Sequence, residues 1–188
     1  MNKQIIYGGA FNPPTIGHLK IIKYLVEKFP NNKIIILPTN NFYKSNEIVS
    51  YEHRKKMLEI MCEDIIENIE ISDYEQTLHD YLGTYYTLEY FNHPYFVIGA
   101  DSLETLHKWI KYPDVVVDNK FIVFPRADID IEEVINNNEI LNNNRDNFII
   151  CNDFIENDIS STAYRVNKNE TYIDQNVLKY IKDNNLYK

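Results

Sequence analysis

One stretch near the start of the chain, residues 5–18, constrains the fold more than any other. It reads IIYGGAFNPPTIGH, a short apolar strand that leads through a glycine turn and two prolines directly into an amphipathic helix. Glycines let a ligand come close to backbone N–H groups, and a helix N-terminus attracts an anion through its unpaired N–H groups. Thr15 and His18 lie three residues apart at this junction, so both side chains can face one anion. The stretch therefore predicts a site for a nucleotide phosphate.

Strand and helix patterns alternate along the whole chain. A strand is expected at about 4–7, a helix at 18–29, and the continuous apolar run 33–37 is typical of a strand buried on both faces. Further strands are expected at 69–72, 95–98, 121–124 and 147–150, and helices at 51–66, 84–91, 102–109, 131–135, 159–165 and after Asp174. The Asn-rich patches 136–138 and 142–144 are expected in surface loops. This alternation predicts an α/β fold with a doubly wound, mainly parallel sheet, in a single domain over residues 1–188.

The composition excludes several classes of protein. A hydrophobic share of 44% with 13% aromatic residues argues against disorder, and a net charge of −9 argues against nucleic-acid binding, which usually needs a basic face. Cys62 and Cys151 form no CxxC pair and are expected to be free thiols of a reducing compartment. No signal peptide precedes the first strand and no apolar run is long enough to span a membrane, so we expect a cytoplasmic protein without a membrane partner.

A second phosphate candidate is the stretch ISSTAYR at 159–165. Ser160 and Ser161 can cap a helix, and Arg165 shares a helix face with Ser161 and Thr162. Hydroxyls and a guanidinium therefore converge where a di- or triphosphate tail can bind. The alternative is an ordinary capped surface helix, and the presence of the first motif favours the phosphate site. The chain lacks both G-x-G-x-x-G and the lysine-bearing Walker A pattern, which argues against a nicotinamide dehydrogenase and a P-loop NTPase.

The stretch IGADSLETLHKW at 98–109 follows another expected strand. Asp101 lies at the strand end and can accept from ribose hydroxyls, whereas Trp109 is either a core anchor or a flat surface for an aromatic base or a pyridine ring. Lys44, in the polar loop 38–49, is either a solvated charge or a lysine that reaches a phosphate. Ligands of open parallel sheets bind at the carboxyl ends of the strands, so we expect the three stretches to serve one composite site.

Together these motifs resemble the bacterial-type nicotinate-nucleotide adenylyltransferases of the nucleotidylyltransferase superfamily, over nearly the whole chain. GGAFNPPTIGH at 8–18 is similar to the family's opening motif with its (H/T)-x-G-H signature, and ISSTAYR to its closing motif. The segments HRKKMLEI at 53–60, YYT at 85–87, FPR at 124–126 and Leu-Tyr at 186–187 also match. The resemblance implies a Rossmann-like nucleotidylyltransferase fold.

The same resemblance implies a reaction between ATP and nicotinate mononucleotide, which gives nicotinate adenine dinucleotide and pyrophosphate. The mononucleotide phosphate would attack the α-phosphorus of ATP in line, with Mg²⁺ offsetting the phosphate charge and no metal ligand from the protein. The implied catalytic residues are His18, Thr15 and Arg165. The implied ATP-binding residues are Gly8, Gly9, Phe11, Lys44, Gly99, Asp101, Ser161 and Thr162, and those implied for the pyridine nucleotide are Tyr86, Thr87 and Trp109.

Some positions depart from the family pattern. Thr15 stands where many members of this branch have histidine, and threonine there also occurs in phosphopantetheine adenylyltransferases. The lid lacks the family's Pro-Pro-His before Lys44, and Tyr85 replaces a serine. Several alternatives stay open: the same chemistry on nicotinamide mononucleotide, on phosphopantetheine, or on a sugar or alcohol phosphate, and a non-catalytic nucleotide-binding module. The oligomeric state is open as well, with a homo-oligomer as one option.

Overall fold

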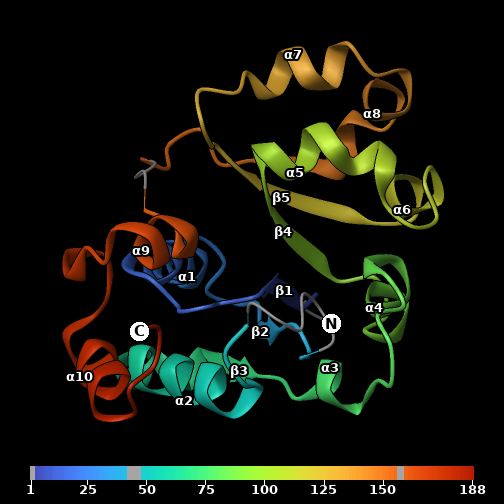
Figure 1. Cartoon of the computed structure of the whole chain (residues 1–188). Helices are drawn as coiled ribbons and strands as arrows, with labels where there is room; N and C mark the ends of the chain where they lie inside the picture. Colours follow the sequence, from blue (N-terminus) through green and yellow to red (C-terminus); the bar gives the residue numbers. More distant parts are fainter. Residues whose placement is uncertain (1–2, 42–47, 156–158) are drawn as a thin grey trace. The chain divides into compact units, whose positions relative to one another are not determined.

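The computed structural model describes residues 3–41, 48–155 and 159–188 (Figure 1). The described residues form six strands in the order β3-β2-β1-β4-β5-β6, flanked by helices. The pairs β1–β4, β2–β3, β4–β5 and β5–β6 are all parallel. The strand order runs outward in both directions from β1 and β4, as a doubly wound sheet requires. The α/β fold with a parallel sheet is therefore confirmed.

The chain divides into two compact units. The first unit contains residues 3–7 and 82–155, and the second contains 8–81 and 159–188 among the described residues. Strand β1 (Ile5–Gly9) contributes residues to both units. The expectation of a single domain over residues 1–188 stays a prediction.

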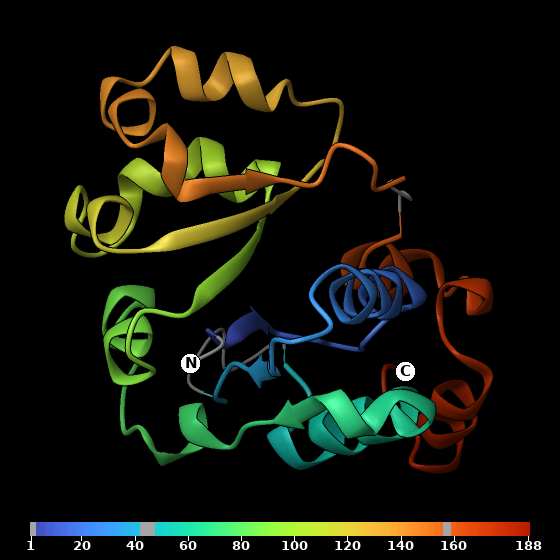
Figure 2. The ribbon, with the colours of Figure 1, turned by 180° about the vertical axis from the view of Figure 1, so that it is seen from behind.

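The second unit is built on β2 (Ile34–Pro38), whose five residues are all buried, as its apolar run predicts. Ile34 of β2 lies opposite Ile69 of β3 (Ile69–Ile71). Helix α10 (Gln175–Asp183) begins at its cap Asp174 and lies beside α2 (Figures 1 and 2). The other elements of this unit are α1 (Ile16–Lys28), α2 (Tyr51–Met61), η1 (Glu63–Asn68), α3 (Tyr74–Thr77), α9 (Ser161–Asn167) and η4 (Glu170–Tyr172).

The first unit is built on β4 (Tyr95–Gly99) and β5 (Lys120–Phe124), which are in register from Tyr95 and Lys120 to Gly99 and Phe124. Strand β6 (Phe148–Ile150) pairs with β5 on its other side. The helices of this unit are α4 (Thr84–Tyr90), α5 (Ala100–Thr105), η2 (Leu106–Lys108), α6 (Asp114–Val117), α7 (Ile131–Asn136), α8 (Glu139–Asn143) and η3 (Arg145–Asn147). No helix of the described residues has the length and apolarity needed to cross a membrane.

Several expected elements differ in extent. The helix expected at 51–66 ends at Met61, because the backbone leaves the helical region at Cys62 (φ −101°, ψ 6°), and the 3-10 segment η1 follows. The helix expected at 102–109 divides into α5 and η2, so that Trp109 lies beyond both with extended backbone. The prediction that the Asn-rich patches lie in loops is wrong at α8. The Asn138 side chain accepts from two backbone N–H groups and caps this helix.

Candidate active site

Thr15 and His18 cap the start of α1 through hydrogen bonds to each other. Thr15 is fully buried and caps the helix, and His18 is the third helical residue. The backbone N–H of Thr15 donates to Nδ1 of His18 over 2.9 Å, and Thr15 Oγ1 lies 2.8 Å from the same nitrogen. In return, the backbone N–H of His18 contacts Thr15 Oγ1 at 3.5 Å. This is a capping box in which the imidazole takes the place of the usual glutamate.

The capping box assigns the protonation of the His18 ring. A backbone N–H can only donate, so Nδ1 of His18 must accept and carries no proton. The ring proton then resides on Nε2, which is the nitrogen on the far side from Thr15. Nε2–H of the half-buried imidazole is therefore a hydrogen-bond donor at the N-terminus of a 13-residue helix. A donor in that position suits an anion.

The hydroxyl of Thr15 gives a first prediction. We expect Thr15→Val, which keeps the side-chain shape but removes Oγ1, to lower the free energy of unfolding by about 1 kcal/mol through loss of the cap. Thr15→Ser is the matched control, because it retains the hydroxyl. Urea denaturation of both variants measures the effect. Equal stability of the valine and serine variants would contradict the capping role.

The second phosphate candidate contacts the first directly. The Ser161 hydroxyl donates to the Pro13 carbonyl over 2.7 Å, and Arg165 Nη1 donates to the Asn12 carbonyl over 2.6 Å. Gly17 permits this approach, because a Cβ atom there would lie 3.0 Å from the Ile159 carbonyl oxygen. Helices α1 and α9 lie side by side in both views (Figures 1 and 2). The structure thus brings residues 12–18 and 159–165 together within the second unit.

Helix α9 supplies a partly engaged guanidinium. Ser160, rather than Ser161, caps the helix by accepting from the backbone N–H of Ala163 at 3.1 Å. Arg165 Nη2 donates to Thr162 Oγ1 over 3.2 Å, so the expected shared face of Thr162 and Arg165 is present. The guanidinium has five N–H donors, of which the contacts to Asn12 and Thr162 engage two. The remaining donors can bind a phosphate.

The glycine turn places the aromatic ring of Phe11 in contact with His18. The Phe11 ring meets the His18 ring edge-on with centroids 5.1 Å apart, and Phe11 has a positive φ of 46°. A Cβ atom at Gly9 would lie 3.3 Å from the Phe11 ring, so a side chain there would crowd the turn. Gly8 and Gly9 form the end of β1. Lys44, the expected lid lysine, lies outside the described residues.

Sequence reasoning missed Arg54, which anchors this turn. Arg54 is 0% exposed, yet its hydrogen-bond partners in the described part of the chain are neutral oxygens rather than carboxylates. Its Nη1 donates to the Ala10 carbonyl at 2.8 Å, its Nη2 to the Thr39 carbonyl at 2.7 Å and Asn41 Oδ1 at 3.3 Å, and its Nε to the Val49 carbonyl at 2.9 Å. Burial lowers the pKa of Arg54. The side chain thus ties the glycine turn to the segments that follow β2.

The first unit places Asp101 at the carboxyl end of β4. A Cβ atom at Gly99 would lie 2.5 Å from Asp101 Oδ1, so only glycine lets this carboxylate fold back over the strand end. Arg126 Nε lies 3.5 Å from Asp101 Oδ2, and both side chains are about half exposed. Such an exposed pair contributes little to stability and leaves both groups accessible. Arg126, from the FPR segment after β5, is a polar group that sequence reasoning did not assign.

The residues implied for the pyridine ring also lie in the first unit. Trp109 is half-buried, and its ring meets Phe96 edge-on at 6.2 Å, so it is partly a core anchor. Gly83 has a φ of 99°, and a Cβ atom there would lie 2.8 Å from the side chain of Ile110, which brings the start of α4 against the residue after Trp109. Tyr86 is 38% exposed, whereas Thr87 is 5% exposed and offers a ligand little side-chain surface.

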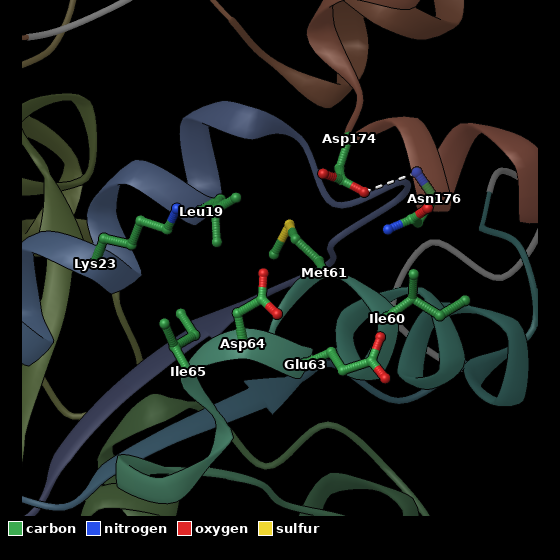
Figure 3. A pocket seen from close by; sticks show the side chains of 9 residues that line it. All are labelled: Leu19, Lys23, Ile60, Met61, Glu63, Asp64, Ile65, Asp174 and Asn176. Atoms are coloured by element: carbon green, nitrogen blue, oxygen red, sulfur yellow. Dashed lines mark hydrogen bonds between the residues drawn. The ribbon is translucent and has the colours of Figure 1, made fainter.

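The second unit also has a hollow that is lined by residues other than those predicted for the site. Figure 3 shows it between α1, the end of α2, η1 and the start of α10, where Asp174 accepts from the backbone N–H of Asn176. Its volume of about 110 Å³ is small against the roughly 300–1,000 Å³ of typical ligand pockets. None of the residues predicted for the site lines it. Its size and lining therefore do not match the nucleotide site that the sequence predicts.

Known proteins resemble this chain over almost its full length. A relative from Acholeplasma laidlawii (strain PG-8A), named probable nicotinate-nucleotide adenylyltransferase, is 36% identical over 190 residues, which cover 97% of this chain and 96% of that protein. A relative of the same name from Fusobacterium nucleatum subsp. nucleatum is 37% identical over 196 residues, 96% of this chain and 95% of that protein.

The fold and a family model agree with these relatives. The solved structure of Plasmodium falciparum nicotinic acid mononucleotide adenylyltransferase complexed with APC has a TM-score of 0.80 at 22% identity, and the match covers 99% of this chain and 98% of that chain. At this identity the likeness shows a shared fold. Residues 6–167 match the family described as cytidylyltransferase-like. The chain therefore belongs to the cytidylyltransferase-like family and, within it, to the nicotinate-nucleotide adenylyltransferases.

Proposed function

We propose that the chain transfers the adenylyl group of ATP to nicotinate mononucleotide, giving nicotinate adenine dinucleotide and pyrophosphate for NAD biosynthesis. The observation that carries the proposal is the contact of the two candidate phosphate motifs, in which Arg165 donates to the Asn12 carbonyl, six residues before His18 in the chain. Family membership supports the same chemistry, because the two curated relatives are named for it.

The reaction needs positioning and charge stabilisation more than covalent chemistry. A phosphate oxygen of the mononucleotide attacks the α-phosphorus of ATP, a new P–O bond forms, and the bond to the β-phosphate breaks to release pyrophosphate. Nε2–H of His18 would donate to an oxygen of the α-phosphoryl group, where negative charge is redistributed in the transition state. Thr15 would hold the ring in place. The carboxyl group of the nicotinate ring takes no part in this step, and no covalent enzyme intermediate is needed.

The outer phosphates would bind to α9. Arg165 and Thr162 would supply side-chain donors there, whereas Ser161 holds α9 to the turn by donating its hydroxyl proton to the Pro13 carbonyl. Gly8, Gly9 and Phe11 shape the turn. Lys44 would add a positive charge. Mg²⁺ would arrive with ATP, held chiefly by phosphate oxygens.

The first unit would bind the two nucleosides. Gly99 and Asp101 would serve the adenosine side, where the exposed carboxylate can accept from ribose hydroxyls. Trp109 would stack on the pyridine ring, with the more exposed Tyr86, rather than the buried Thr87, at its carboxylate. We also propose a cytoplasmic location, where ATP and the mononucleotide are available.

A substrate panel tests the proposal. The protein is incubated with ATP and Mg²⁺ together with nicotinate mononucleotide, nicotinamide mononucleotide or phosphopantetheine, and pyrophosphate release and product mass are followed. We expect a dinucleotide from nicotinate mononucleotide. A product from phosphopantetheine alone would replace the proposed substrate, and the absence of product from all three would favour a non-catalytic nucleotide-binding module.

The stacking role of Trp109 gives a second prediction. We expect Trp109→Ala to raise KM for nicotinate mononucleotide about 10-fold and KM for ATP less than 2-fold, because stacking on an aromatic side chain contributes roughly 1–3 kcal/mol per base. Trp109→Phe, which keeps a flat ring against Phe96, is the control and should lose much less. Steady-state kinetics with each substrate varied in turn gives both constants. Equal increases for the two substrates would reject the assignment.

A further inference from the structure

Asn12 lies at the centre of the phosphate-binding turn and is held from two directions. Its side chain is 3% exposed. Asn12 Oδ1 accepts the backbone N–H of Val49 at 3.1 Å and the hydroxyl of Tyr187 at 2.9 Å. Tyr187 is 175 residues away along the chain, so this contact joins two remote segments of the second unit. The side chain of Asn12 therefore has a fixed position.

The backbone carbonyl of Asn12 also binds the guanidinium of Arg165. The Asn12 carbonyl accepts from Arg165 Nη1, and Arg165 Nη2 contacts Thr162. A fixed Asn12 backbone therefore determines where the free edge of the guanidinium lies. The chain of contacts runs from the Tyr187 hydroxyl through Asn12 to the group that we assign to the phosphates.

Tyr187 is itself well anchored. Its ring meets that of Tyr164 edge-on at 6.2 Å, and its carbonyl accepts from Lys168 Nζ. Burial raises the pKa of the Tyr187 hydroxyl, while the charges of Arg54 and Arg165 oppose the shift. Tyr187 therefore keeps its proton near neutral pH and stays a donor to Asn12. Tyr164 directly precedes Arg165 on α9. Tyr187 therefore contacts the helix through the ring of Tyr164 and the turn through Asn12.

We propose that Tyr187 is a positioning residue for the adenylyl transfer: its hydroxyl fixes Asn12, and Asn12 fixes the guanidinium of Arg165 for the phosphates of ATP. The proposal rests on the proposed function, because it concerns the same site. It assigns to Tyr187 a role that acts through Asn12.

Tyr187→Phe tests the hydroxyl alone, and Tyr180→Phe is the matched control. Tyr180 also lies in the second unit, and its hydroxyl bonds His53 Nδ1 at 2.9 Å rather than Asn12. We expect Tyr187→Phe to raise KM for ATP roughly 3- to 10-fold, the range of one hydrogen bond, with KM for nicotinate mononucleotide within 2-fold. Tyr180→Phe should leave both constants within about 2-fold of the parent. Thermal unfolding of each variant is measured alongside.

A double-mutant cycle separates positioning from simple structure. In an Arg165→Lys background, which lacks the forked contact, Tyr187→Phe should change KM for ATP by less than about 2-fold. A lower melting temperature for Tyr187→Phe with unchanged kinetic constants would overturn the proposal, and so would fully additive effects with Arg165→Lys. The parent protein is assayed first: if it forms no dinucleotide the proposed function fails, whereas an active parent with an unaffected Tyr187→Phe variant refutes only the positioning role.

Discussion

His18→Ala is expected to lower kcat by about 10²–10³-fold, the cost of removing one preorganised donor to a developing charge. The capping box holds Nδ1 of His18 as an acceptor, so the donor on Nε2 is in place before the substrate arrives. The alanine variant removes this donor and the cap partner of Thr15 together. Single-turnover measurement of dinucleotide formation at saturating substrates isolates the chemical step.

Two companion variants identify the cause of the loss. His18→Gln restores a usual capping-box residue, so it should recover the helix start and the stability while recovering only part of kcat. His79→Ala removes an exposed histidine of the same unit and should leave kcat unchanged. A kcat near that of the parent for His18→Ala would show that the imidazole does not act in the transfer step.

The two candidate phosphate motifs, at 8–18 and 159–165, were predictable from their glycine, proline and capping residues. Glycine, proline and capping residues act locally, so the sequence around Thr15 and around Ser160 indicates a strand end and a helix start without knowledge of the fold. The contact between Gly17 and Ile159 could not be foreseen, because it depends on the packing of α1 against α9.

Arg54 and Tyr187 were not predictable for a different reason. Their partners are backbone carbonyls and an amide, and every residue has a carbonyl, so no sequence spacing marks such contacts. A charged residue on a helix is usually solvated, and the pattern of α2 gives no sign that Arg54 is buried. The end of α5 before Trp109 was missed because helix boundaries are set by local backbone geometry and packing that apolar periodicity does not report.

Arg54→Met is expected to lower the free energy of unfolding by about 3 kcal/mol. The substitution retains an apolar stem of similar length, but it leaves the carbonyls of Ala10, Thr39 and Val49 without their donors, and each unpaired buried acceptor costs about 1–3 kcal/mol. The gain from no longer burying a charge offsets part of this cost. Urea denaturation, followed by circular dichroism, gives the value.

Arg54→Lys and Lys56→Met complete the comparison. Lysine keeps the charge but cannot reach three carbonyls in the planar geometry of the guanidinium, so Arg54→Lys should fall between the parent and Arg54→Met. Lys56 lies on the same helix in an exposed pair with Glu59, and Lys56→Met should change the free energy by less than about 0.5 kcal/mol. A lysine variant as stable as the parent would contradict the role of the carbonyl contacts, because it would mean that the buried charge alone supports the turn. A lysine variant that loses as much stability as methionine would contradict any contribution of the charge. The intermediate loss is expected because one ammonium can donate to some, but not all, of the four neutral oxygens that the guanidinium contacts.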